Sequence, residues 1–179
     1  ARVPVLAHLD GICHSYIHAK ADPAMAEAIV VNAKMRRTGI CGATETVLID
    51  QDYPEPARLI GALLDAGCEV RADDMLMELD ARTVQADEAD WGTEYLEPIV
   101  SAKMVSGVDE AIEHIARYGS QHTESIITSD DAAAAQVKCT LASRVAEAGG
   151  ATCWLWSSHK PHRWGCAGNG RILHTTNTC

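Results

Sequence analysis

Hydrophobic and polar positions over residues 12–136 follow two alternating periods, one typical of strands and one typical of amphipathic helices. Short, β-branched runs predict strands at residues 12–18, where the pattern also alternates, and at 45–50, 68–72, 98–105 and 124–129. Stretches with helical spacing lie between and after these runs and predict helices within residues 22–37, 55–67, 73–81, 107–119 and 130–150. Strands that alternate with helices of this length need crossover connections. The expected fold class is therefore α/β, with a mostly parallel sheet covered by helices.

The local signals at helix ends agree with this assignment. Asp22 stands where an N-cap is expected, and Pro23 follows at the first helical position. Lys34 and Arg36 fall in the predicted last turn, where cations are favourable, and Gly39 then ends the helical pattern. Gly67 similarly marks the end of the second predicted helix.

Charge divides the chain into two parts. Residues 1–136 carry 24 acidic and 10 basic side chains, whereas residues 137–179 carry one acidic and five basic side chains. The second part also holds three of the four Trp, four of the seven Cys and three of the eight His residues. We therefore expect an α/β domain over residues 1–136, followed by a helix remnant and a divergent tail, either frame-shifted or disordered, over residues 137–179.

Composition narrows the class of protein. A chain of 179 residues with 47% hydrophobic and 22% charged residues can form one globular domain. The net charge of -10 argues against nucleic acid as a partner, and no apolar run approaches the ~18 residues of a membrane span. The first ten residues do not resemble a signal peptide, and seven scattered cysteines favour reduced thiols. These features predict a cytoplasmic protein.

Cys41 is the first candidate for chemistry, and two interpretations are open. A buried cysteine that packs as a small hydrophobic residue is the commoner case. The flanking glycines Gly39 and Gly42, the nearby charges of Lys34, Arg36 and Arg37, and the helix-to-strand junction favour a reactive thiolate instead. Residues alone do not decide between the two.

A second polar segment follows the helix predicted over residues 107–119. Its simplest interpretation is a helix end with a solvated loop. Residues 105–126 nevertheless resemble the signature of the gamma-glutamyl phosphate reductase (glutamate-5-semialdehyde dehydrogenase) family, within the aldehyde dehydrogenase superfamily. The matching positions are Val105, Ala111, Ile112, His114, Ile115, Tyr118, Gly119, Ser120, His122, Thr123, Glu124 and Ile126.

The same resemblance extends to residues 29–49, which are similar to the family's active-site segment. It implies that Cys41 is the catalytic nucleophile, although Gly42 stands where the family usually has Asn. Residues 93–100 are similar to a superfamily segment whose glutamate contacts the cofactor, which implies this role for Glu94. His8 replaces the general base of hydrolytic relatives, as expected of an enzyme that releases phosphate and activates no water. Ser120 and His122 are candidate contacts to phosphate or substrate, with a structural role as the alternative.

The resemblance also implies an activity and its participants. The expected reaction is the NADPH-dependent reduction of L-glutamyl 5-phosphate to L-glutamate 5-semialdehyde in proline biosynthesis, through a cysteine thioester. The small-molecule substrate, NADPH/NADP, a second copy of the chain and a glutamate 5-kinase are the expected partners. The family's Rossmann half has no counterpart in this sequence, so the 179 residues are expected to cover the catalytic half and to be inactive alone.

The last segment keeps an alternative open. The family pattern stops near Ala135, and Cys153, His159, His162 and Cys166 have the residue types of a zinc site at nonstandard spacing. No metal is assigned to them. The alternative function is a non-catalytic α/β scaffold or binding protein, with a metal-binding Cys/His tail.

Overall fold

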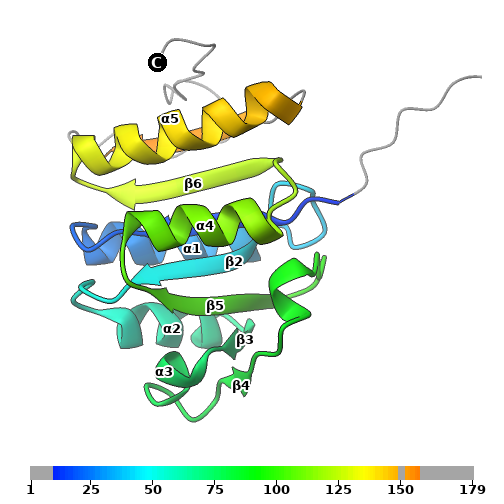
Figure 1. The fold of residues 1–179 in the computed structure, drawn as a ribbon. Helices are drawn as coiled ribbons and strands as arrows, with labels where there is room; N and C mark the ends of the chain where they lie inside the picture. Colours follow the sequence, from blue (N-terminus) through cyan, green and yellow to red (C-terminus); the bar gives the residue numbers. More distant parts are fainter. Residues whose placement is uncertain (1–9, 149–151, 158–179) are drawn as a thin grey trace, which may run out of the picture.

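A parallel sheet forms the centre of the molecule (Figure 1). The computed structural model describes residues 10–148 and 152–157, with side chains through residue 141. In this part of the chain, seven strands pair in the order β4-β3-β5-β2-β1-β6-β7, and every pair is parallel. The strands are β1 (Cys13–Ile17), β2 (Thr44–Asp50), β3 (Glu69–Ala72), β4 (Val84–Gln85), β5 (Ile99–Val105), β6 (Thr123–Thr128) and β7 (Thr152–Ser157).

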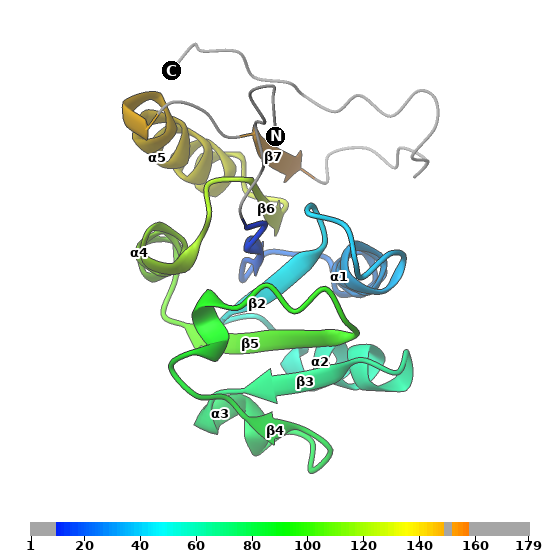
Figure 2. The ribbon, with the colours of Figure 1, turned by 90° about the vertical axis from the view of Figure 1, so that its right-hand side faces the viewer.

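Helices cover both faces of this sheet (Figure 2). The helices are α1 (Pro23–Met35), α2 (Pro56–Asp65), α3 (Asp74–Met77), the 3₁₀ turn η1 (Asp90–Gly92), α4 (Val108–Tyr118) and α5 (Asp131–Ala148). Helices α1 and α2 pack on one face, and α4 and α5 lie on the other. The predicted α/β class, with a mostly parallel sheet covered by helices, is confirmed.

Each central strand supplies side chains to two separate cores. Successive side chains of a strand point to opposite faces, so Ile17 joins the core under α1 and α2 while Tyr16 joins the core under α4 and α5. Val47 and Leu48 divide between the two cores in the same way. The central strands are therefore buried on both faces, and their polar residues, such as Ser15 and Thr46, are buried together with the apolar ones.

The expected helix ends are present. The Asp22 side chain accepts a hydrogen bond from the Met25 amide, and Pro23 opens α1. Gly67 adopts a φ of 84° after α2, a conformation that glycine reaches without steric cost. Helix α1 ends at Met35, so Arg36 is its C-cap and Arg37 lies in the following loop.

Two strands lie outside the sequence prediction. Strand β4 has only two residues, and β7 pairs with β6 from Thr152 to Ser157. Helix α5 continues without a break through residues 136 and 137, where the charge pattern changes. Among the described helices, none combines the length and apolar character that a membrane crossing requires.

Candidate active site

The candidate site residues lie together at the side of the sheet that is formed by the amino-terminal ends of its strands. Strands β5, β2, β1 and β6 are parallel neighbours, so the segments that precede them lie at the same edge. Cys41 precedes β2, Glu94 precedes β5, and Ser120 and His122 precede β6. Open α/β sheets generally bind ligands at the carboxyl ends of their strands, and this group of residues lies at the opposite edge.

Cys41 lies on an exposed turn between α1 and β2. The amide of Ala43 donates a hydrogen bond of 2.9 Å to the carbonyl oxygen of Ile40, which closes the turn around Cys41. The Cys41 side chain is exposed, and so is the neighbouring Ile40. The buried-filler interpretation of Cys41 is therefore wrong, and the thiol is open to solvent reagents.

Gly11 brings Cys41 and Glu94 together. A Cβ atom on Gly11 would lie 2.3 Å from the carbonyl oxygen of Cys41 and 2.8 Å from Oε1 of Glu94. Only a residue without a side chain leaves room for both groups at the start of β1. By contrast, a Cβ on Gly42 would meet nothing within 4 Å, and one on Gly39 would meet only the Leu96 carbonyl oxygen, at 3.8 Å. Of these three glycines, Gly11 is therefore the one that lets protein segments approach each other closely.

Cys13 lies beneath the Cys41 turn. Its thiol donates a hydrogen bond of 3.1 Å to the Cys41 carbonyl oxygen, and its Sγ lies 3.6 Å from Nδ1 of His122. Burial, followed by the negative charge of Glu124, raises the pKa of Cys13 to about 12. Cys13 therefore stays a protonated donor at neutral pH.

Ser120 and His122 both contact the start of the sheet. The hydroxyl of Ser120 accepts a hydrogen bond of 2.9 Å from the Ile12 amide, so it fixes the approach to β1. Nδ1 of His122 lies 2.8 Å from the hydroxyl of Thr123. The fold brings both residues to the edge that carries Cys41, with Cys13 between His122 and the Cys41 turn.

Lys34 does not supply a free positive charge near Cys41. Its Nζ lies 2.6 Å from Oε2 of Glu45, and both side chains are completely buried. Because the two charges neutralise each other, the predicted contribution of Lys34 to a thiolate is wrong. Arg36 and Arg37 remain exposed in the loop before Cys41.

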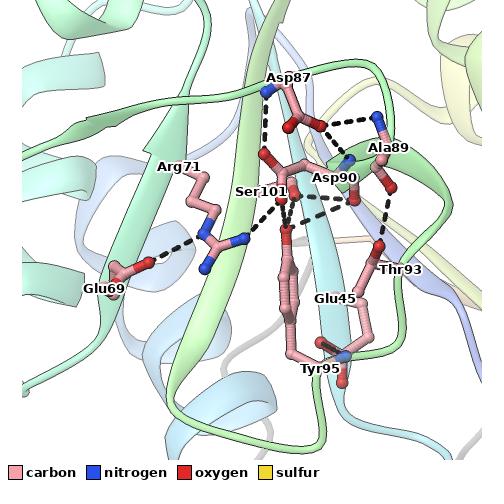
Figure 3. A network of polar contacts seen from close by, with 9 residues as sticks. All are labelled: Glu45, Glu69, Arg71, Asp87, Ala89, Asp90, Thr93, Tyr95 and Ser101. Atoms are coloured by element: carbon pink, nitrogen blue, oxygen red, sulfur yellow. Dashed lines mark hydrogen bonds and ion pairs between the residues drawn. The ribbon is translucent and has the colours of Figure 1, made fainter.

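A polar network holds the segment that carries Glu94 (Figure 3). The Tyr95 hydroxyl lies 2.8 Å from both Oδ1 of Asp90 and the hydroxyl of Ser101. Arg71 donates a bond of 2.7 Å to Oδ1 of Asp90, and the Thr93 hydroxyl donates to the carbonyl oxygen of Ala89. Although burial alone would raise it, the pKa of Asp90 is lowered by the Asp87 amide, the Arg71 guanidinium and Tyr95.

Two histidines and Glu124 form a second buried group behind the site. The Glu124 carboxylate accepts a hydrogen bond of 2.9 Å from the His14 amide and lies 3.1 Å from Nδ1 of the same residue. His114 packs edge-on against His14 and Trp91, and its ring lies 4.7 Å from that of Tyr118. Burial, followed by charge repulsion from His14, lowers the pKa of His114 to about 3. His114 is thus a neutral packing residue.

Sequence reasoning did not find Gly11, Cys13, Glu45 or Tyr95. Gly11 precedes β1 and Cys13 is its first residue, but their contacts with Cys41 depend on how β1 and β2 are aligned. Glu45 reads as a polar residue at the start of a strand, and only the pairing with Lys34 reveals its burial. Patterns along one segment carry no signal for such contacts between segments.

Part of the predicted chemistry falls outside the described residues. His8, His159, His162 and Cys166 are among these positions, and Cys153 is described only as backbone in β7. Among the described residues, no group of three or more His, Cys, Asp or Glu side chains is arranged so that it could hold a metal ion.

The chain is similar to known proteins of one family. No family model matches it. A gamma-glutamyl phosphate reductase of Novosphingobium aromaticivorans is 61% identical over 130 residues, which are 73% of this chain and 31% of that protein. A second one, from Rhizorhabdus wittichii, is 58% identical over 130 residues. The chain spans about a third of the length of the curated relatives it matches.

Similar solved structures include members of the same family. The crystal structure of gamma-glutamyl phosphate reductase from Thermotoga maritima has a TM-score of 0.70 and 38% identity, over 76% of this chain and 33% of that one. The enzyme from Saccharomyces cerevisiae has a TM-score of 0.63 and 25% identity, over 88% of this chain and 38% of that one. An acetylating aldehyde dehydrogenase from Geobacillus thermoglucosidasius, at 18% identity and a TM-score of 0.54, shares the fold.

Proposed function

We propose that this chain, which belongs to the gamma-glutamyl phosphate reductase family, carries the acyl-transfer site of such an enzyme. The substrate is L-glutamyl 5-phosphate, and the products are L-glutamate 5-semialdehyde and phosphate. The reaction is a step of proline biosynthesis, with NADPH as the reductant, in the cytoplasm. A second copy of the chain and a glutamate 5-kinase are its proposed protein partners.

One observation supports this function above the others, namely the exposed Cys41 turn beside the Glu94 carboxylate. The two groups come from the segments that precede β2 and β5, and they meet across Gly11, where no side chain intervenes. An accessible thiol is what a nucleophile needs, and a polar group beside it can orient a second reactant.

The proposed reaction begins at Cys41. Its thiolate attacks the acyl carbon of the substrate, a C–S bond forms, and the C–O bond to phosphate breaks. Phosphate leaves, and a thioester of Cys41 remains. Because hydride and not water resolves this thioester, no group is needed to activate water. Addition of hydride to the thioester carbon and cleavage of the C–S bond then release the aldehyde and regenerate the thiolate.

The negative oxygen that develops in both stages needs hydrogen-bond donors. The Ala43 amide is already engaged by the carbonyl oxygen of Ile40, so the amides of Cys41 and Gly42 are the candidates in this turn. Gly42 leaves open space around the turn, which favours access of the acyl group. Ser120 and His122 lie at the same edge and are our candidates for contacts to the phosphate or to the amino-acid end of the substrate.

Glu94 is our candidate for the cofactor contact. Its carboxylate is partly exposed and faces the space that Gly11 leaves beside Cys41, so it fits the ribose of a nicotinamide nucleotide. NADPH, when bound there, would supply the hydride. The chain corresponds to about a third of its relatives, and we therefore expect weak NADPH binding and little turnover from these 179 residues alone.

The acyl-transfer step can be tested without the cofactor. Acetyl phosphate serves as the probe, and mass spectrometry of peptides locates the acetyl group. We expect a hydroxylamine-sensitive adduct at Cys41, since thioesters react readily with hydroxylamine, and no such adduct in a Cys41→Ser variant. Acetylation confined to lysines, or spread evenly over the cysteines, would contradict the proposal and favour a non-catalytic scaffold.

Cofactor binding has a separate test. Fluorescence titration of the chain with NADPH is expected to show no saturation in the micromolar range. Micromolar affinity that is lost in Glu94→Gln would show that these residues bind the nucleotide on their own. Micromolar affinity that is unchanged in Glu94→Gln would remove Glu94 from the proposed site.

A further inference from the structure

A buried ion pair brackets the loop that carries Cys41. Lys34 lies in the last turn of α1, and Glu45 is the second residue of β2, so the pair closes the base of the loop between them. The distance from Nζ to Oε2 is 2.6 Å, and neither side chain has any solvent exposure. Removing two charges from water is costly, and such a pair is weak support for stability as such. Its position suggests a different role.

The same carboxylate also holds the segment that carries Glu94. Oε2 of Glu45 accepts a hydrogen bond of 3.3 Å from the Tyr95 amide. Burial raises the pKa of Glu45, whereas Lys34 and the backbone of Tyr95 and Leu96 lower it. One oxygen atom therefore connects α1, β2 and the segment before β5.

The far side of Tyr95 is fixed independently. Figure 3 shows the Tyr95 ring standing between Glu45 at one end and Asp90 and Ser101 at the other. The ring also lies 5.8 Å from Nζ of Lys34 and 5.1 Å from the guanidinium carbon of Arg71. With its backbone held by Glu45 and its hydroxyl by Asp90 and Ser101, Tyr95 leaves the adjacent Glu94 little freedom to move.

We infer that Glu45, paired with Lys34, is a positioning residue that keeps the Cys41 loop and the Glu94 segment in a fixed relation. Glu45 is fully buried and lies in the strand after the turn, so it acts through the backbone and not on a reactant. The effect on Cys41 chemistry rests on the proposed function. The mechanical connection of the two segments does not.

The test compares the wild-type chain with two variants. Glu45→Gln keeps the shape but leaves the Lys34 charge buried without its partner, so this chain has a risk of unfolding. A Lys34→Met, Glu45→Leu double variant removes both charges at similar volume and is the better test, because such replacements are often neutral for stability. Glu27→Gln is the matched control, since Glu27 lies in the same helix and forms an exposed ion pair of 2.7 Å with Arg58.

Hydrogen exchange measured by mass spectrometry tests the mechanical connection. In the double variant we expect amides of residues 37–43 and 93–97 to exchange together, at least ~10-fold faster than in the wild-type chain. Amides of α4 and the Glu27→Gln control should keep their rates. Unchanged exchange in both segments, or faster exchange in only one of them, would overturn the inference.

The rate at which acetyl phosphate acetylates Cys41, compared with the rate of its alkylation by iodoacetamide at the same pH, tests the chemical consequence. If the pair positions Cys41, acetylation slows at least ~10-fold in the double variant, whereas alkylation, which needs only an accessible thiol, keeps its rate. Equal acetylation rates in the two chains overturn this part of the inference. Absence of acetylation at Cys41 in the wild-type chain contradicts the proposed function, and the exchange result then still decides the connection.

Discussion

The buried thiol of Cys13 donates its hydrogen bond to the backbone carbonyl of the exposed Cys41. One cysteine is thus a fixed donor inside the sheet, and the other is presented to solvent on a turn. The contrast follows from position, because Cys13 starts the central strand β1 whereas Cys41 precedes the start of β2. The two thiols should therefore differ in their reactivity toward alkylating reagents.

Cys41 should be alkylated well before the two buried cysteines. Burial raises the pKa of Cys13 to about 12 and that of Cys68 to about 11, and only thiolates react. At pH 7.5 we expect these two residues to react at least ~100-fold more slowly than a free cysteine. Limited iodoacetamide treatment followed by peptide mass spectrometry checks the order. Equal labelling of the three residues in the folded chain would contradict it, whereas equal labelling in urea is expected.

Gly11→Ala should disturb the site through backbone contacts. The new Cβ would lie 2.3 Å from the Cys41 carbonyl oxygen and 2.9 Å from its Cα, so the loop or β1 has to shift. We expect a loss of about 1–3 kcal/mol in the free energy of unfolding, as for other overpacked positions. Urea denaturation measures it.

Gly61→Ala is the matched control for this substitution. Gly61 lies within α2, and an added Cβ there meets nothing within 4 Å. Alanine is favoured over glycine inside helices, so this variant should gain roughly 0.5–1 kcal/mol. A Gly11→Ala variant as stable as the Gly61→Ala chain would show that Cys41 does not contact Gly11 closely.

Periodicity predicted most of the fold because the central strands and their covering helices obey simple rules. Residues of β2 are buried on both faces, and the consecutive apolar residues Val47, Leu48 and Ile49 reflect this directly. Strand β4 was not predicted, since two exposed residues, Val84 and Gln85, carry no period. Strand β7 lies where the family pattern stops, and its pairing with β6 is a relation between distant segments.

The site was predicted only in part. An exposed thiol at Cys41 agrees with the flanking glycines and the loop position. The roles of Lys34 and Gly11 were not predictable, because a lysine at a helix end normally reaches solvent and a glycine before a strand has many uses. Both roles depend on which loops the parallel register brings to one edge, and that information lies in contacts between segments.

Tyr95→Phe should loosen the Glu94 segment without unfolding the chain. The hydroxyl contacts Asp90 and Ser101 at 2.8 Å, and burial raises the pKa of Tyr95, so the group is a neutral donor and acceptor. Loss of such bonds costs about 1 kcal/mol, since the Ser101 hydroxyl keeps its bond of 3.1 Å to the Asp90 carbonyl oxygen. Comparing Tyr95→Phe, Ser101→Ala and the double variant by urea denaturation isolates their coupling. Strict additivity of the two effects would contradict the contact.

His114 should make stability depend on pH below neutrality. Its pKa is about 3 in the folded chain and 6.5 as a free side chain, so between these values the unfolded chain binds more protons. Stability from this group is complete above pH 6.5 and falls as the pH drops toward 3. At pH 5 the free energy of unfolding is lower by about 2 kcal/mol, because each pH unit below the free pKa of 6.5 lowers it by about 1.36 kcal/mol. His114→Phe keeps a ring against Trp91 and Tyr118 but cannot titrate, so the difference in unfolding free energy between the two chains should change by this amount between pH 7 and pH 5. A difference that stays constant over this range would show that His114 is protonated in the folded chain or is open to solvent.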